Sequence, residues 1–276
     1  MITNANMMDY AERIKEIEQI SIEHPYFNHA MDRLQHAISI RRSGGEARHT
    51  LLIGESGVGK TYLVNRLVRT YPPYEVDGRV RIPLAVVQTP AIPTLKSLAE
   101  ATLNALGDPF AGRGTAANMR SRALKIVENA QVVMLIYEEL QHFLDHGAQN
   151  SVNAVSDWLK SFIDSSRVCV LLTGLQRSEA ILNVNEQLRR RFSTHLVFDR
   201  FRYGTAEEKA LFRAILQKID KALPLVEMQG LAEPELATRL YYASNGLLGY
   251  LTKLIISTFE LMVQQQCVRL DRELFE

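Results

Sequence analysis

The stretch Gly54-Glu55-Ser56-Gly57-Val58-Gly59-Lys60-Thr61 fits the phosphate-binding pattern GxxxxGK[ST] at every required position. It follows the apolar run Leu51–Ile53 and leads, through Tyr62, into a segment of helical character. In this pattern the glycines let backbone N–H groups surround phosphate oxygens, while the lysine adds a mobile cation. The positive end of the following helix points at the same phosphates. We therefore expect residues 54–62 to bind a nucleotide, with the hydroxyl of Thr61 as a Mg²⁺ ligand.

Short apolar strands alternate with helical segments on both sides of this loop. A strand that is followed by a phosphate-binding loop and then by more strand and helix pairs predicts an α/β fold with a doubly wound, mainly parallel sheet of five strands. The ligand of such a sheet lies at the carboxyl ends of the strands. The expected strands are His49–Ile53, Val80–Gln88, Val132–Tyr137, Val168–Thr173 and Thr194–Phe198.

The pattern divides the chain into three parts. Residues 1–45 read as two helices broken at Pro25, residues 46–203 as the α/β core, and residues 204–276 as a small helical lid. The strand signal disappears after about Thr205. The expected lid helices are Glu207–Ala222, Glu233–Ala243 and Leu247–Val263.

Composition sets outer bounds on function. The chain has 276 residues, of which 46% are hydrophobic and 23% charged, and its formal net charge of +1 gives no global attraction to nucleic acid or membrane. The longest apolar runs are too short to span a bilayer, and the first residues do not resemble a signal peptide. Cys169 and Cys267 lack metal-ligand spacing and read as reduced interior residues. We expect a cytoplasmic protein that has no membrane partner.

Two acids follow the apolar strand Val132–Tyr137, where a Walker B pair belongs. Glu138 stands where an aspartate usually holds Mg²⁺, and its extra methylene moves the carboxylate outward, which predicts slow hydrolysis. Glu139 is the candidate that polarises the attacking water. The alternative is a pair of solvated acids at a strand end. Thr173 ends the next strand and is either a contact for the γ-phosphate or a simple β-former.

Three arginines, Arg189, Arg190 and Arg191, end a helix before the last strand. Cations are favoured at the C-terminus of any helix by the helix dipole. A planar guanidinium is also the group best suited to stabilise charge on a transferring phosphoryl group. These arginines lie too far along the chain to reach their own loop, so as catalytic groups they would serve the nucleotide of a neighbouring subunit.

The order of these motifs resembles that of an AAA+ ATPase. The acids followed by Leu140-Gln141-His142, the strand end Thr173-Gly174 and the run Gln187–Phe192 make the chain similar, more narrowly, to the TniB/TnsC family of transposition regulators, with a role like that of MuB. The resemblance implies a sheet of order 5-1-4-3-2 and ATP with Mg²⁺ as cofactors. Tyr250 stands where many AAA+ proteins place a sensor arginine, and Lys253 is a candidate substitute.

The same resemblance implies the partners and the action. ATP would drive assembly into rings or helical filaments, hexameric per turn, on double-stranded DNA without sequence preference. The assembly would recruit and activate a transposase for DNA transposition and recombination, and ATP hydrolysis would control disassembly. A target-selecting protein of the TniQ type, attached in some systems to an RNA-guided CRISPR complex, would be a further partner.

A filament needs few phosphate contacts per subunit, because many subunits share one duplex. The candidate DNA-binding residues follow the second strand: Lys96, Arg113, Thr115 and Arg120. They supply cations and a hydroxyl beside glycines that permit close backbone approach, and the resemblance places this region at a DNA channel. A helix-helix loop with solvated arginines is the alternative.

Two other functions fit a P-loop. An initiator or loader of AAA+ type would remodel a protein partner, but such proteins usually carry a further DNA-reading domain, and we expect none here. A small-molecule kinase would need a substrate lid and has no use for the arginine run before the last strand. Both remain alternatives to the transposition regulator.

Overall fold

The computed structural model describes residues 12–18, 20, 22–91, 94–145, 149–225, 229–265 and 270. The first eleven residues of the predicted N-terminal segment, and Cys267, lie outside these ranges. The chain divides into two compact units. The sheet unit comprises residues 26–55 and 60–198, and the helical unit comprises residues 1–25, 56–59 and 199–276.

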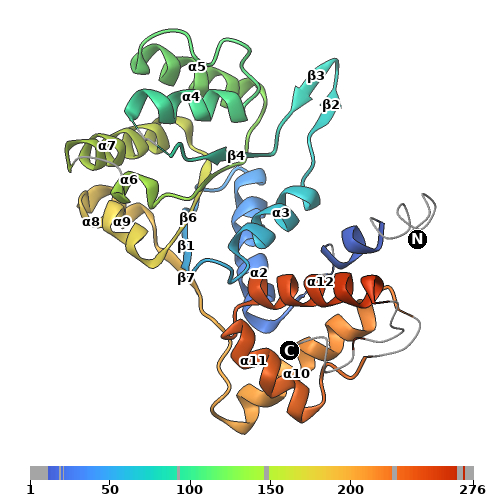
Figure 1. The fold of residues 1–276 in the computed structure, drawn as a ribbon. Helices are drawn as coiled ribbons and strands as arrows, with labels where there is room; N and C mark the ends of the chain where they lie inside the picture. The colour runs from blue at the N-terminus through green and yellow to red at the C-terminus, as the bar shows by residue number, and fades with distance from the viewer. Residues whose placement is uncertain are drawn as a thin grey trace. The chain divides into compact units, whose positions relative to one another are not determined.

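A five-stranded parallel sheet forms the centre of the sheet unit (Figure 1). Its strands are β1 (Thr50–Gly54), β4 (Leu84–Gln88), β5 (Met134–Glu138), β6 (Cys169–Gly174) and β7 (Thr194–Phe198). Their order in space is β4-β5-β6-β1-β7, and each neighbouring pair is parallel. Numbered along the chain, this is the predicted order 5-1-4-3-2, so both the α/β class and the topology are confirmed.

Helices cover both faces of the sheet (Figure 1). α2 (Pro25–Arg42) and α3 (Lys60–Thr70) lie on one face, where the thiol of buried Cys169 approaches the carbonyl of Ala37. A large buried cluster on the other face joins alternate strand residues such as Leu51, Tyr137 and Leu172 to the helices. These helices are α4 (Leu95–Ala105), α5 (Ala116–Asn129), α6 (His142–Asp145), α7 (Gln149–Ser166), α8 (Glu179–Asn183) and α9 (Glu186–Arg191), with a 3₁₀ turn at Gln176–Ser178.

The predicted strand Val80–Gln88 is wrong as a single element. Its first residues pair instead in a hairpin of β2 (Tyr74–Val76) and β3 (Arg79–Arg81), whose turn residues Asp77 and Gly78 both have positive φ. Pro83 causes the break, because it has no N–H to donate to a neighbouring strand. Its carbonyl accepts hydrogen bonds from the N–H groups of Val133 and Met134, and β4 begins at the next residue.

In the helical unit, α10 (Ala206–Ala222), α11 (Pro234–Ser244) and α12 (Leu248–Gln264) each lie within one residue of the prediction. A capping box between Thr205 and Glu208 starts α10. Gly249 of α12 donates its N–H to the carbonyl of Gly57 over 2.8 Å, which groups residues 56–59 with this unit. Among the described residues, no single helix is long and apolar enough to span a membrane; α11 and α12 qualify only as a pair bent by 114°.

A buried histidine predicts how stability depends on pH. The His49 ring accepts a hydrogen bond from the N–H of Val170, and burial, helped by the charge of Arg191, lowers the pKa of His49 from 6.5 to about 4. The unfolded chain therefore binds this proton more readily, so the stability that neutral His49 contributes is present above pH 6.5 and is lost as pH falls toward 4.

In H49N the amide oxygen can replace the ring nitrogen as acceptor. We expect this variant to flatten the fall in the free energy of unfolding between pH 6.5 and 4, by up to roughly 3 kcal/mol. Chemical denaturation over a pH series measures the effect. H36N, on the exposed side of α2, is the matched control and should keep the slope of the wild type. An H49N slope equal to that of the wild type would contradict the assignment.

Candidate nucleotide-binding site

The phosphate-binding loop leaves the sheet at the carboxyl end of β1, the strand between β6 and β7. Gly57 and Gly59 have φ angles of +83° and +102°, a region that residues with a Cβ rarely enter. α3 begins directly afterwards at Lys60. The glycine spacing is thus a backbone requirement, and it turns the loop back toward the strand end.

Lys60 is the central cation of the site. Its Nζ donates to the carbonyls of Gly54 and Glu55, each over 2.8 Å, and the residue is only 7% exposed. Burial lowers the pKa of Lys60 below its usual value, while the nearby charges of Glu139 and Glu138 oppose that change. An ammonium group has three N–H donors, so one is left for a phosphate oxygen.

Glu138 ends β5 and is 3% exposed. One carboxylate oxygen accepts a hydrogen bond of 2.7 Å from Gln88 Nε2, whereas the other is buried and has no partner within the described part of the chain. A buried oxygen of this kind fits a divalent cation, which takes oxygen ligands. The described residues contain no cluster of three or more metal-ligating side chains. Thr61 and Glu138 would therefore hold Mg²⁺ together with nucleotide phosphates and water.

Glu139 has a left-handed backbone, with φ of +57°, which is costly for a residue with a Cβ. Its carboxylate is contacted by Nε2 of Gln141. The Oε1 of Gln141 accepts a hydrogen bond of 3.1 Å from the N–H of Leu175, just beyond β6. Gln141 therefore ties the candidate water-polarising acid to the end of the neighbouring strand.

Thr173 lies at this same edge. It is 1% exposed on β6, the strand between β1 and β5, and its carbonyl accepts the N–H of Leu140. The structure thus gathers Lys60, Glu138, Glu139 and Thr173 at the carboxyl edge of the sheet. Sequence reasoning missed Gln88 and the holding role of Gln141; Gln88 ends the strand next to β5, and that position was the available signal.

The three arginines lie at the opposite edge. β7 pairs Thr194 with Thr50 and Phe198 with Gly54, so α9, which precedes β7, ends at the amino edge of the sheet. A strand of this length places that edge roughly 15 Å from the loop. Arg190 pairs with Glu186 and Arg191 with Asp164. Arg189 is exposed and has no ion pair with any described residue.

The predicted DNA-binding residues occupy the α4 and α5 hairpin. Lys96 is exposed in the first turn of α4, and Thr115 caps α5. The Arg113 guanidinium lies 5.0 Å over the ring of Phe110, at an exposed tip. Arg120 instead donates to three oxygens of α7, on Ser161 and Ser165. Lys96 and Arg113 are thus available at the surface, while Arg120 holds α5 against α7.

The sheet order, the loop after β1 and the acids after β5 define the chain as a P-loop protein with the AAA+ ATPase fold. More specifically, residues 13–202 match the family described as Bacterial TniB protein, so the chain belongs to the TniB family. The predicted resemblance is confirmed at the level of this family. No curated protein sequence is a significant match.

Solved structures agree on the fold. The Aeropyrum pernix ORC1 protein in complex with DNA matches with a TM-score of 0.66 at 15% identity, covering 93% of this chain and 65% of that one. Cdc6p from Pyrobaculum aerophilum matches with a TM-score of 0.63 at 14% identity, and the match covers 91% of this chain and 65% of Cdc6p. The Thermotoga maritima RuvB Holliday junction branch migration motor matches with a TM-score of 0.54 at 16% identity, and the match covers 90% of this chain and 66% of RuvB. The chain therefore spans about two thirds of the length of these proteins, and identities this low show the fold alone.

A substitution at Gly174 tests how tightly the side chains of Gln141 and Ser178 pack against this position. A Cβ at this position would lie 2.3 Å from Ser178 Oγ and 2.9 Å from Gln141 Oε1. We expect G174A to lower the free energy of unfolding by about 1–3 kcal/mol, because a tightly packed site must shift. Thermal and denaturant unfolding measure it.

S178A supplies the matched control, since the Ser178 hydroxyl is buried without a partner in the described chain. Alone, this change should be nearly neutral. Combined with G174A, it should restore part of the lost stability, because the shortest clash is gone. Equal destabilisation of G174A and the double variant would show that the contact with Ser178 does not set the cost.

Proposed function

We propose that this protein is an ATP-dependent transposition regulator that assembles on double-stranded DNA and recruits and activates a transposase. One observation carries the proposal. The P-loop lysine and the two acids meet at one edge of the sheet, while the arginines before β7 lie at the other edge. A site divided in this way is completed only by a second subunit, so bound ATP becomes an assembly signal.

The residues at the carboxyl edge have distinct tasks in ATP hydrolysis. Mg²⁺, when bound, neutralises phosphate charge and orients the terminal phosphate. Lys60 binds the outer phosphates through its remaining donor, and the backbone of residues 54–59 surrounds them. Glu139 orients the attacking water, and its left-handed backbone and its contact with Gln141 fix the direction of its carboxylate. Glu138, being longer than the usual aspartate, favours slow turnover, and Thr173 contacts the γ-phosphate or the water.

Arg189 is the proposed catalytic arginine that acts on the ATP of the neighbouring subunit. Arg190 and Arg191 are engaged by Glu186 and Asp164 within their own chain. A guanidinium contributed in trans couples hydrolysis to assembly, because the isolated subunit lacks the group that stabilises the transition state.

DNA contact is assigned to the exposed tip and first turn of the α4 and α5 hairpin. Lys96, Arg113 and Thr115 offer two cations and a hydroxyl, which contact phosphates without reading bases. Arg120 supports them indirectly by fixing α5 to α7. The ORC1 protein, which shares the fold, was solved in complex with DNA, and this supports DNA binding as such, not its location on the hairpin.

Membership of the TniB family supports the choice of protein partners. We propose a transposase as the recruited enzyme and a TniQ-like target selector, with or without an RNA-guided CRISPR complex, as the second partner. Filaments or rings, hexameric per turn, would present many copies of each docking surface. ATP hydrolysis would then remove the assembly from DNA.

Nucleotide-dependent assembly is the direct test. With a non-hydrolysable ATP analogue and duplex DNA, the wild type should form rings or filaments in electron micrographs. K60A should form none and should lose nucleotide-dependent DNA binding by a factor of about 100 or more, since the buried cation and its phosphate contact are removed together.

A charge-reversed pair, K96E with R113E, separates the two sites. It should bind the fluorescent nucleotide as the wild type does and lose most of its affinity for DNA. Monomers under every nucleotide condition would exclude the proposed function. Loss of nucleotide binding in the charge-reversed pair would mean that the hairpin is not a separate DNA contact.

The arginine assignment predicts an effect that depends on assembly. R189A should reduce the ATPase rate of DNA-bound assemblies by about a hundredfold or more, as expected for a catalytic arginine supplied in trans. It should leave nucleotide binding and the slow rate of dilute monomers unchanged. R190A, which removes an exposed i,i+4 pair, is the control and should stay within about threefold of the wild type. A larger loss in R190A than in R189A would overturn the choice of Arg189.

A further inference from the structure

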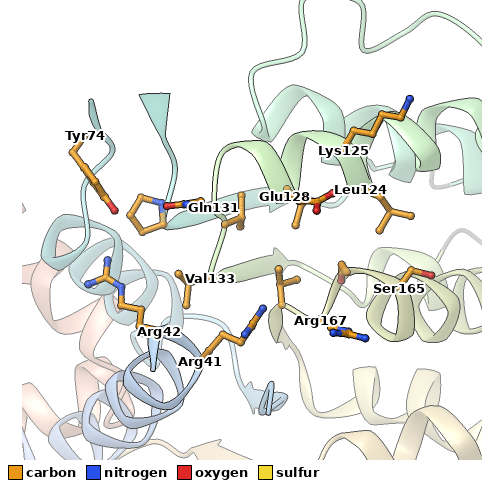
Figure 2. Close-up of a pocket in the computed structure, with 15 residues that line it drawn as sticks. Arg41, Arg42, Tyr74, Leu124, Lys125, Glu128, Gln131, Val133, Ser165 and Arg167 are labelled. Atoms are coloured by element: carbon orange, nitrogen blue, oxygen red, sulfur yellow. The ribbon is translucent and has the colours of Figure 1, made fainter. Parts of the chain in front are cut away.

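A second cavity lies in the sheet unit, at the amino edge of the sheet (Figure 2). Its volume is about 950 Å³, which is within the range of ligand sites. The end of α2, the β2 and β3 hairpin, the end of α5 and the turn between α7 and β6 enclose it. Because β5 and β6 begin here and end at the Glu138 and Thr173 edge, the cavity is separate from the candidate nucleotide site.

Cations dominate this cavity. Arg41, Arg42, Lys125 and Arg167 line it, against the single acid Glu128. Figure 2 shows Arg41 reaching from α2 toward the middle, with Arg167 at the side on the turn before β6, while Lys125 points away. Neither Arg41 nor Arg167 has an ion pair with a carboxylate of the described chain.

Two residues that line the cavity also carry a buried donor without a partner in the described part of the chain. The Nε of Arg41 and the hydroxyl of Ser166 are buried, and neither makes a hydrogen bond to a described residue. Unsatisfied buried donors are rare because they cost about 1–3 kcal/mol each. These two donors are covered, so the preference for an anionic ligand rests on the excess of cations over acids among the lining residues.

Tyr74 lines the cavity, and the hairpin continues this surface beside it. Tyr74 is 47% exposed and Val76 is 42% exposed. The hairpin register places Tyr74 opposite Arg81 and Val76 opposite Arg79, so all four side chains share one face. Tyr and Arg are the residue types enriched at protein interfaces. The floor continues this apolar surface with Pro83 and Val133.

We propose that this cavity docks an acidic peptide segment of a protein partner, in which carboxylates alternate with apolar side chains. The carboxylates pair with the forked donors of Arg41 and Arg167, and the apolar side chains pack on the hairpin and the floor. A nucleic-acid backbone gains nothing from the apolar surface of Tyr74, Pro83 and Val133, so this lining favours a peptide. The proposal does not rest on ATP or DNA binding.

Fluorescence anisotropy tests the proposal on the full chain. The probe is a short labelled peptide in which glutamate alternates with leucine, compared with the same peptide carrying glutamine in place of glutamate. The wild type should bind only the acidic peptide. R41E with R167E should weaken binding by about a hundredfold, roughly tenfold for each lost charged pair. The milder pair R41Q with R167Q should weaken it in the same direction, and thermal unfolding checks that each variant is folded.

K125E is the matched control, because it makes the same change of charge at a lining residue whose ammonium end points away from the middle of the cavity. It should bind within about threefold of the wild type. Equal loss in K125E would mean general electrostatic attraction and would overturn the proposal. So would equal binding of the two peptides. A labelled single-stranded oligonucleotide that binds in preference to the peptide, and is lost in R41E with R167E, would instead make the cavity a nucleic-acid site. K60A should bind the peptide normally, which keeps this test apart from that of the proposed function.

Discussion

A buried ammonium group is the constraint on which the carboxyl edge depends. An isolated charge with 7% exposure would cost several kcal/mol, and the cost is offset only by close, well-placed partners. The partners of Lys60 are the carbonyls of Gly54 and Glu55 at the end of β1, which accept its hydrogen bonds. The negative charges of Glu138 and Glu139, at the end of β5 on the far side of β6, also favour its charged form. The carbonyls are within reach because the loop curls back, and the curl requires positive φ at Gly57 and Gly59. The loop glycines, the lysine and the acids therefore form one physical unit.

Parallel strands give the sheet two chemically different edges. Residues that follow strands gather at the carboxyl edge, where the acids and Thr173 lie, whereas residues that precede strands gather at the amino edge. α9 precedes β7 and the α7 turn precedes β6, which places Arg189 and Arg167 at the amino edge. Strand direction thus separates the arginines of one chain from the candidate nucleotide site of the same chain by the length of a strand. The proposed sharing of ATP between subunits is a consequence of strand direction.

The sequence was most informative where one local rule decides the structure. Apolar runs located the five strands, and helical periodicity located the lid helices to within a residue. The prediction failed at Pro83, where a missing N–H outweighed the apolar pattern of residues 80–88. The holding role of Gln141 could not be predicted, because its two partners, Glu139 and Leu175, meet it only after β5 and β6 have paired. Hydrogen bonds between residues far apart in the chain produce no periodic pattern in the sequence, so periodicity cannot predict them.

Net charge was the least informative quantity, and the structure explains why. The formal charge of +1 sums over the whole chain, whereas ions screen interactions beyond about 8 Å, so a ligand responds to the charges near its own site. The cavity beside α2 and the hairpin is lined by four cations and one acid. A second cavity at the amino edge adds three cations, Arg33, Arg48 and Arg191, and one acid, Glu46. Acids elsewhere in the chain offset this excess of positive charge, many of them at exposed helix positions such as Glu207 and Glu235. A nearly neutral chain can therefore carry a strongly basic edge, and composition excludes only partners that would need a uniformly charged surface.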